Sequence, residues 1–578
     1  IILPVAVFSP LLRRPPRARP LVAMAVDTGM LGSQLMQLDI PKDGSARIVA
    51  VSVEEEADGS TVWTVKFRAK PNAVRSAAAT APSPRAPGAG LAPLNVDLPA
   101  FSPGLSVEEG SPSPMSQQPH MDRLLPMICQ VKTYAWGKCG SDSLVAQVAS
   151  EGIDELEVIE DTPYAELWMG THPSGPSMVM LTTPWKMVTP LSEWIKLNPY
   201  LRGPRHREIE PRVNRRKSMI KLERSAMPFL FKLLSVRTAL SIQAHPDKVL
   251  AAELHRKDAN NYKDDNHKPE MAVAITPFEA LCSFQPAYSI LCNCRATPEL
   301  VAVISESCVR ELERAIEHRE QDPEAVRHSL KALFSALMTA PFNTVQLHLS
   351  ELVSRIESTS KMLRSPVDEL ALRLHEQYPS DVGVFCVYLL NYKVLQPGEA
   401  IFLAANEPHA YIYGDCAEVM ATSDNVIRAG LTPKWKDVST LCSSLTYYDG
   451  PPHLVNPTTD PMQPFVARYT PPVEEFVLDR IQMRDGQQAY LSSSRSLSIL
   501  IIVNGSIAVE QISDVARGDV LHEQTIFQSY LSTGAIHLVC PNTALRMTAQ
   551  HGDVLAFRAT SPSKDAIDEK SPSQRNAH

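Results

Sequence analysis

The sequence predicts a mainly β protein that carries an inserted α-helical domain. Short segments of alternating apolar and polar residues, broken by Gly and Pro, run from 134 to 284 and again from 384 to 557, as is typical of half-buried antiparallel strands. Between 297 and 380 the apolar residues recur with the helical period instead. The chain has 578 residues. This length suits roughly three or four domains, so we expect the helices to form an insertion between β parts.

Composition limits the classes of function. Hydrophobic residues make up 44% and charged residues 21% of the chain, as in ordinary soluble proteins. A net charge of -8 gives no general affinity for nucleic acid, so an anionic substrate must be bound by local basic groups. The ten cysteines include no C-x-x-C pair, which favours reduced thiols and a cytoplasmic location. No apolar run reaches a membrane-spanning length, so we expect no membrane partner, and we expect a monomer.

Residues 1–120 are expected to be a leader extension that is largely disordered. Four arginines precede the first acid, Asp27, which is compatible with an organelle transit peptide, although an unstructured leader explains the composition equally well. Alternation on both sides of Asp58-Gly59 predicts a hairpin at 47–67. The stretch 77–118 is rich in Pro, Ala, Ser and Gly and is expected to be a disordered linker.

The helical segment has clear start signals. Thr297-Pro298, Asp322-Pro323 and Ser365-Pro366 each place a capping residue before a proline that suits the first helical position. We therefore predict an inserted helical domain at 297–380, and we expect no chemistry in it.

A candidate metal site begins at Gln243 and His245. Two residues apart on a strand, these side chains point to the same side, and Pro246 should end the strand there. A set of nitrogen and oxygen ligands with room for water is typical of a catalytic zinc site. Two stretches downstream offer the groups that would complete it: Glu270 lies beside Lys268 and a second imidazole, His267, and His409 lies just after a probable strand. Manganese, iron or cobalt would also accept such ligands.

The chain resembles type I phosphomannose isomerase, a family of the cupin superfamily, in six motifs that occur in register. They cover roughly three quarters of the chain. The motifs are Tyr134-Ala-Trp-Gly-Lys138, Tyr164-Ala-Glu-Leu-Trp-Met-Gly-Thr-His-Pro-Ser174, Gln243-Ala-His245, His267-Lys-Pro-Glu270, Pro408-His409-Ala-Tyr411 and Ser423-Asp-Asn-Val-Ile-Arg-Ala-Gly-Leu-Thr-Pro-Lys434.

The resemblance implies cupin-type jelly-roll barrels and one Zn²⁺ per chain, held by Gln243, His245, Glu270 and His409. It implies a zinc-binding catalytic domain at 121–296 and 381–470. A second jelly roll is expected at 471–558, followed by a disordered tail at 559–578. The reaction implied is the reversible isomerisation of mannose 6-phosphate and fructose 6-phosphate through an enediol or enediolate, in support of GDP-mannose and glycan synthesis.

Roles for further residues also come from the resemblance. Arg428 suits an enediolate or a phosphate because its charge is fixed and its donors are forked. Lys268 is the favoured group for proton transfer, with water on the metal as the alternative, and His267 could help ring opening. Asp424 could orient Arg428 or move a hydroxyl proton; an ordinary surface ion pair is the simpler explanation for an isolated Asp and Arg. The residues expected to bind or enclose substrate are Trp136, Glu166, Lys232, Tyr411 and Lys434.

Simpler explanations compete with several of these roles. Lys232 could be an extended side chain at a strand edge, and Trp136 and Tyr411 could be core residues. The basic stretch 202–224 is expected to be a solvated loop, with a polyanion-binding patch as the alternative. An iron-dependent cupin oxygenase would use the same ligands but needs no basic cluster around phosphate. A sugar-phosphate-binding protein without catalysis is the third hypothesis.

Overall fold

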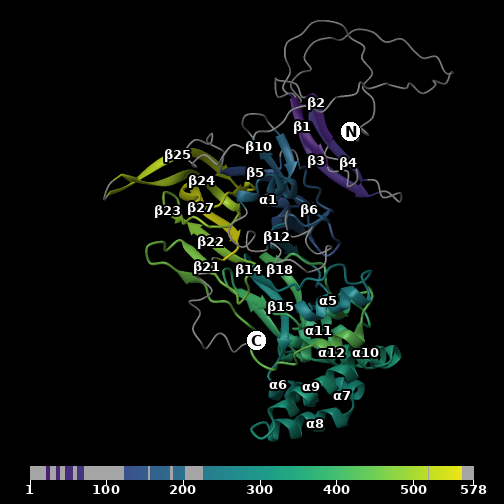
Figure 1. Cartoon of the computed structure of the whole chain (residues 1–578). Helices are drawn as coiled ribbons and strands as arrows, with labels where there is room; N and C mark the ends of the chain where they lie inside the picture. The colour runs from purple at the N-terminus through teal and green to yellow at the C-terminus, as the bar shows by residue number, and fades with distance from the viewer. Residues whose placement is uncertain are drawn as a thin grey trace, which may run out of the picture. The chain divides into compact units, whose positions relative to one another are not determined.

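A computed structural model (Figure 1) describes residues 123–562 apart from 154–155, 182–186, 202–225 and 518–519, and strands within the first 69 residues. The chain forms two compact units, one made of Ile1–Leu21 with Asp39–Asp122 and the other of Val22–Leu38 with Arg123–His578. The linker predicted at 77–118, the basic stretch 202–224 and the tail from 563 lie outside the described residues.

In the first unit, β3 (Ala46–Glu55) and β4 (Thr61–Ala69) pair antiparallel, which confirms the predicted hairpin. The strands β1 (Leu21–Val26) and β2 (Gln34–Asp39) were not predicted. β1 is a nearly unbroken apolar run, and in the second unit its residues Ala23 and Met24 add in parallel to the strand β11. An apolar run of this kind can join an open strand edge.

The sheet that carries the predicted ligands is antiparallel and has ten strands. Its longest strand, β18, pairs through residues 409–413 with β15 and through 414–421 with β12. The strand turns at Gly414, whose φ is +113° and where an added Cβ would lie 2.4 Å from the Pro277 carbonyl oxygen. Only glycine fits this bend. The strands are β6 (Gln130–Lys132), β9 (Glu166–Met169), β12 (Phe229–Val236), β13 (Ile242–Ala244), β14 (Glu270–Ala274), β15 (Phe278–Phe284), β16 (Leu390–Leu395), β17 (Ala400–Leu403), β18 (His409–Ala421) and β19 (Ile427–Gly430).

A second large sheet is built on the C-terminal segment, and strands from the beginning of the catalytic segment extend it. β26 pairs with β5, β5 with β10, and β10 with β11. These early strands belong to the predicted catalytic segment 121–296, and alternation alone does not reveal which sheet a strand joins. Besides β1 and β2, its strands are β5 (Leu124–Ile128), β10 (Met178–Leu181), β11 (Met187–Pro190), β20 (Thr458–Thr459), β21 (Val466–Tyr469), β22 (Val477–Met483), β23 (Gln488–Leu491), β24 (Ser498–Arg517), β25 (Val520–Ser532), β26 (Ile536–Val539) and β27 (Ala544–Thr560). Two short strands, β7 (Lys138–Cys139) and β8 (Pro163–Tyr164), pair separately.

The helical insertion begins before the predicted start at 297, because α6 already follows Pro286. Thr297, Asp322 and Ser365 are N-cap residues as predicted, and Ser365 forms a capping box with Asp368. The helices of this part are α6 (Ala287–Ala296), α7 (Pro298–Ile304), α8 (Glu306–Glu317), α9 (Pro323–Met338), α10 (Phe342–Ser358) and α11 (Pro366–Gln377). Outside it lie α1 (Leu144–Gly152), α2 (Leu191–Leu197), α5 (Lys248–Lys257) and α12 (Val438–Ser444).

One hydrophobic core joins the helical insertion to the ligand-bearing sheet. It includes Leu333 and Phe334 of α9, Leu349 of α10, and Ala410 and Ile412 of β18. The start of β18 is therefore held between helices and sheet. In the described part of the chain, all ten cysteines are free and no helix is long and apolar enough to cross a membrane. The structure is thus a mainly antiparallel β protein with a helical insertion, as predicted.

Candidate metal centre and substrate cavity

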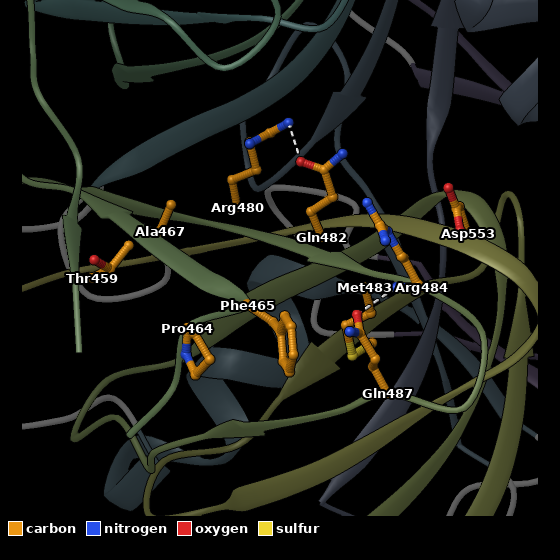
Figure 2. Close-up of a pocket in the computed structure, with 10 residues that line it drawn as sticks. All are labelled: Thr459, Pro464, Phe465, Ala467, Arg480, Gln482, Met483, Arg484, Gln487 and Asp553. Atoms are coloured by element: carbon orange, nitrogen blue, oxygen red, sulfur yellow. Dashed lines mark hydrogen bonds between the residues drawn. The ribbon is translucent and has the colours of Figure 1, made fainter. Parts of the chain in front are cut away.

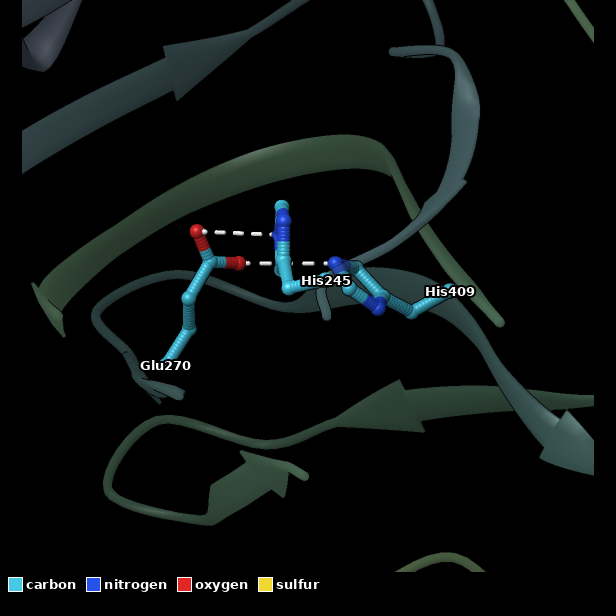
Figure 3. Close-up of side chains that lie close together, drawn as sticks. All are labelled: His245, Glu270 and His409. Atoms are coloured by element: carbon cyan, nitrogen blue, oxygen red, sulfur yellow. Dashed lines mark ion pairs between the residues drawn. The ribbon is translucent and has the colours of Figure 1, made fainter. Parts of the chain in front are cut away.

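Three predicted metal ligands meet where three strands begin or end. β13 ends one residue before His245, Glu270 begins β14, and His409 begins β18. The carboxylate of Glu270 faces both rings, with Oε1 3.3 Å from Nε2 of His245 and Oε2 3.4 Å from Nε2 of His409 (Figure 3). One ligand atom from each residue falls within 4.8 Å of the others, and all three side chains are buried. This spacing suits a single metal ion.

Hydrogen bonds on the far side of each ring leave the facing nitrogens free. Nδ1 of His245 lies 2.8 Å from the carbonyl oxygen of Asn425, and Nδ1 of His409 lies 3.0 Å from that of Glu407. A carbonyl can only accept, so each Nδ1 carries the proton and each Nε2 presents a lone pair. Both Nε2 atoms and Oε2 of Glu270 are buried without a hydrogen-bond partner. Orphaned acceptors that converge in this way fit a bound cation.

The balance of buried charged groups around Glu270 also favours a bound cation. Glu270, Glu166 and Glu418 are three buried carboxylates, and Lys232 and Lys268 are the buried ammonium groups that face them. Burial lowers the pKa of His245 to about 4, so this ring adds no positive charge near neutral pH. With all five groups ionised, they carry one more negative than positive charge, and a divalent cation beside Glu270 would offset it.

Gln243 shares the side of the sheet on which the ligands lie. In the β13–β18 pair it lies opposite His409, and in the β13–β19 pair it lies opposite Arg428. Residues directly opposite on paired strands point to the same side. The Gln243 side chain accordingly lines the cavity described next, beside Glu270.

A cavity of about 460 Å³ opens beside the ligand cluster. Its volume suits a small organic ligand. The buried rings of His245 and His409 are not among its lining residues, whereas most of the predicted residues are. The predicted residues that line it are Trp136, Glu166, Lys232, Gln243, Lys268, Glu270, Tyr411, Asp424, Arg428 and Lys434.

Lys232 is held by two carboxylates. It lies directly opposite Glu418 in the β12–β18 pair, with Nζ 3.0 Å from Oε2 of Glu418 and 3.8 Å from Oε1 of Glu166. The indole N–H of Trp168 donates to Glu166. Burial alone would lower the pKa of Lys232, but the two carboxylates raise it overall. This lysine therefore stays protonated in the cavity wall, where the two carboxylates offset its charge and it can donate hydrogen bonds.

Arg428 is a cation with no carboxylate partner among the described residues. It is half-buried in the cavity and makes no ion pair with any residue that the structure describes. Burial lowers its pKa, and no neighbouring acid opposes this effect. Lys434 lies exposed at the same cavity, and its only hydrogen bond to a described residue is made by its backbone N–H, to Thr432. These two side chains form the part of the cavity that is suited to bind an anion.

Asp424 is oriented by a residue that the sequence analysis did not select. Its carboxylate lies 3.1 Å from Nε2 of His172 and makes no ion pair with Arg428 among the described residues. The Nδ1 of His172 accepts from the backbone N–H of Ser174, so Nε2 carries the proton and donates to Asp424. This hydrogen bond lowers the pKa of Asp424. Neither His172 nor Glu418 was predicted as a site residue. The only sequence signal for His172 is its place in a family motif, and the only signal for Glu418 is that it is an isolated acid in an apolar strand.

His267 does not reach the cavity, in contrast to its predicted role in ring opening. Its Nε2 lies 2.8 Å from Oε1 of Glu475, which also accepts from Lys248. Burial opposes the charge on Glu475, but its contacts with His267 and Lys248 lower its pKa to about 2. The ring is turned away because neighbouring residues on an extended chain point to opposite sides, and Lys268 takes the side that faces the cavity.

Comparison with known proteins is consistent with this geometry. The family description "phosphomannose isomerase type I, catalytic domain" matches residues 124–287, and the description of the helical insertion domain of the same family matches residues 303–390. Mannose-6-phosphate isomerase 1 of Arabidopsis thaliana is 43% identical over 404 residues, which are 69% of this chain and 89% of the relative. The Homo sapiens mannose-6-phosphate isomerase is 41% identical over 391 residues, 67% of this chain and 88% of the relative.

Solved structures are similar as well. A mutant of phosphomannose isomerase from Salmonella typhimurium superposes with a TM-score of 0.60 at 26% identity, over 76% of this chain and 100% of the other. A mannose 6-phosphate isomerase bound with zinc and yttrium gives a TM-score of 0.59 at 26% identity, with the same coverage.

Proposed function

The chain belongs to the type I phosphomannose isomerase family and is an aldose–ketose isomerase, and we propose that it interconverts mannose 6-phosphate and fructose 6-phosphate with one zinc ion per chain. The observation that carries the proposal is a His–Glu–His cluster with free, converging ligand atoms beside a cavity that contains an uncompensated Arg428. We further propose that the activity serves the supply or consumption of mannose 6-phosphate for GDP-mannose and glycan synthesis.

The metal would be held by His245, Glu270 and His409, with Gln243 as a weaker oxygen ligand from the same side of the sheet. When bound, zinc supplies a Lewis acid that polarises the sugar oxygens. The two Nδ1–H hydrogen bonds to backbone carbonyls fix the ring orientations that this binding requires.

Arg428 and Lys434 would divide the negative charges of the substrate between them. Arg428 lies opposite Gln243 in the β13–β19 register, which puts it near the metal ligands, so we assign it to the charge that develops on the sugar oxygens. Lys434 is more exposed and has a flexible side chain, so we assign it to the phosphate group. Lys232 and Glu166 form an ion pair, so their charges offset each other. They would bind sugar hydroxyls, with Lys232 as the donor and Glu166 as the acceptor.

Proton transfer is assigned to Lys268 and Asp424. Nζ of Lys268 lies 3.1 Å from Oε1 of Glu270, at the boundary between the ligand cluster and the cavity. Asp424 lines the same cavity and is held by His172, so it is placed to move a hydroxyl proton. A positioned acid or base contributes about 10² to 10⁴ in rate. Because His267 lies outside the cavity, we give it no part in the reaction.

A coupled assay for fructose 6-phosphate, run on protein with measured zinc content, tests this function. Zinc-loaded protein should convert mannose 6-phosphate but not unphosphorylated mannose, because Lys434 has no phosphate group to bind in the free sugar. Zinc-loaded protein that produces no fructose 6-phosphate would disprove the proposed reaction, and equal turnover of free mannose would disprove the role of Lys434.

A further inference from the structure

A second cavity, of about 620 Å³, lies in the C-terminal sheet (Figure 2) and shares no lining residue with the cavity at the metal ligands. Its walls come from the strands β20, β21 and β22, from the turn that follows β22, and from β27. The residues that line it are Thr459, Pro464, Phe465, Ala467, Arg480, Gln482, Met483, Arg484, Gln487 and Asp553.

The charged wall of this cavity is one side of β22 and its continuation. Arg480, Gln482 and Arg484 are spaced by two residues, while Ile481 and Met483 between them are buried in the core of the sheet. This spacing sends the three polar side chains outward together. Ala467 lies opposite Arg480 on β21, and its small side chain leaves space above the strand.

Neither guanidinium of this cavity has a carboxylate partner among the described residues. The same sheet shows the usual alternative, because Arg468 and Arg558 both pair with the buried Asp479. Asp553, exposed at the rim, is the only acid that lines the cavity. The cavity is therefore locally cationic in a chain of net charge -8.

The amide side chains add donors rather than acceptors. Oε1 of Gln482 accepts from Nη2 of Arg480 at 2.6 Å, and Oε1 of Gln487 accepts from the backbone N–H of Arg484 at 2.7 Å. Both carbonyl oxygens are thus occupied, and the two NH₂ groups are left for a ligand. Figure 2 shows these hydrogen bonds beside the exposed guanidinium of Arg484.

Arg480 is held in place as well. An added Cβ at Gly398 would lie 3.1 Å from Nη1 of Arg480, so the guanidinium packs closely against the turn before β17. A side chain fixed in this way loses little conformational freedom when it binds a ligand. Phe465 and Pro464 supply an apolar wall next to these donors.

From these contacts we propose that this cavity is a second binding site, for a phosphate-bearing small molecule. Two uncompensated guanidiniums and two oriented amide donors match the several acceptor oxygens of a phosphate. The volume and the wall of Phe465 and Pro464 accommodate an organic body attached to that phosphate.

The test must separate this site from the cavity at the metal ligands. In the full chain with Arg428→Ala and Lys434→Ala, calorimetric titration with inorganic phosphate and with glucose 6-phosphate should still detect one site. Addition of Arg484→Gln should weaken that binding tenfold or more, because a charged hydrogen-bond donor to the anion is lost. Asp553→Asn should tighten it, because the one carboxylate at the rim is removed.

Arg495→Gln is the matched control, since Arg495 is an exposed arginine of the same domain that does not line the cavity. It should leave the affinity unchanged. Tighter binding of glucose 6-phosphate than of inorganic phosphate would identify a sugar ester as the ligand, and equal affinity would identify the free anion. Loss of all binding in the Arg428→Ala, Lys434→Ala protein, or binding that Arg484→Gln does not weaken, would overturn the proposal.

Discussion

Arg428 and Lys232 are both cations of the metal-side cavity, yet replacing each by alanine should have different consequences. Arg428 has no carboxylate partner among the described residues, so Arg428→Ala leaves no buried charge behind. Lys232 lies between Glu418 and Glu166, and all three side chains are less than a tenth exposed. Lys232→Ala therefore leaves two buried carboxylates without their cation.

The magnitudes follow from these environments. A unit charge about 4 Å from an oxyanion, at an effective dielectric constant of about 20, contributes about 4 kcal/mol. Loss of this term in Arg428→Ala should lower kcat/KM by up to about 10³, with little change in stability. Removal of one partner from a buried ion pair costs about 3 to 5 kcal/mol, so Lys232→Ala should be clearly destabilised.

Urea unfolding followed by circular dichroism, together with the coupled assay on zinc-loaded protein, measures both effects. Lys232→Met combined with Glu418→Gln should recover much of the stability that Lys232→Met alone loses, because both charges of the pair are then gone. Equal destabilisation by Arg428→Ala and Lys232→Ala would refute the distinction between a paired and an unpaired cation. An unchanged kcat/KM in Arg428→Ala would remove Arg428 from the mechanism.

Three further outcomes are expected. Chelation should abolish activity and zinc should restore it, while Glu270→Gln should retain less zinc in metal analysis; an active metal-free preparation would contradict this. His172→Leu removes the hydrogen bond that lowers the pKa of Asp424, so the acid limb of the kcat profile should move to higher pH and kcat should fall about tenfold; an unchanged profile would exclude the contact from catalysis. Burial lowers the pKa of His537 to about 4, so between pH 6.5 and 4 the unfolded chain takes up a proton that the folded protein does not, and the free energy of unfolding falls by about 3 kcal/mol. Urea unfolding at pH 7 and 4.5 measures this fall, which should be smaller by about that amount in His537→Val. An equal fall in the two proteins would contradict this.

The candidate metal ligands could be selected from the sequence because their determinants are local. Gln243 and His245 share a side of the chain by strand alternation, and Pro246 marks where the strand ends. Glu270 and His409 were selected from their motifs, and each begins a strand, whereas His409 was expected just after one. Capping residues followed by proline likewise marked the helix starts at 298, 323 and 366.

The pairing of charges could not be predicted in the same way. Lys232 and Glu418 are 186 residues apart, and only the register of β12 on β18 sets them opposite each other. The contact between His172 and Asp424, and the turn of His267 toward Glu475, also join residues that are distant in sequence. In the same way, only the folded chain decides that β5 joins the C-terminal sheet.

The sequence alone thus determined the secondary-structure class, the family resemblance and the residues able to bind a metal, because these depend on residue type and short-range spacing. Tertiary structure decided which cations are neutralised and which remain free for an anion. The physical reason is that the energy of a buried charge depends on the groups packed around it, which come from strands far apart in the chain.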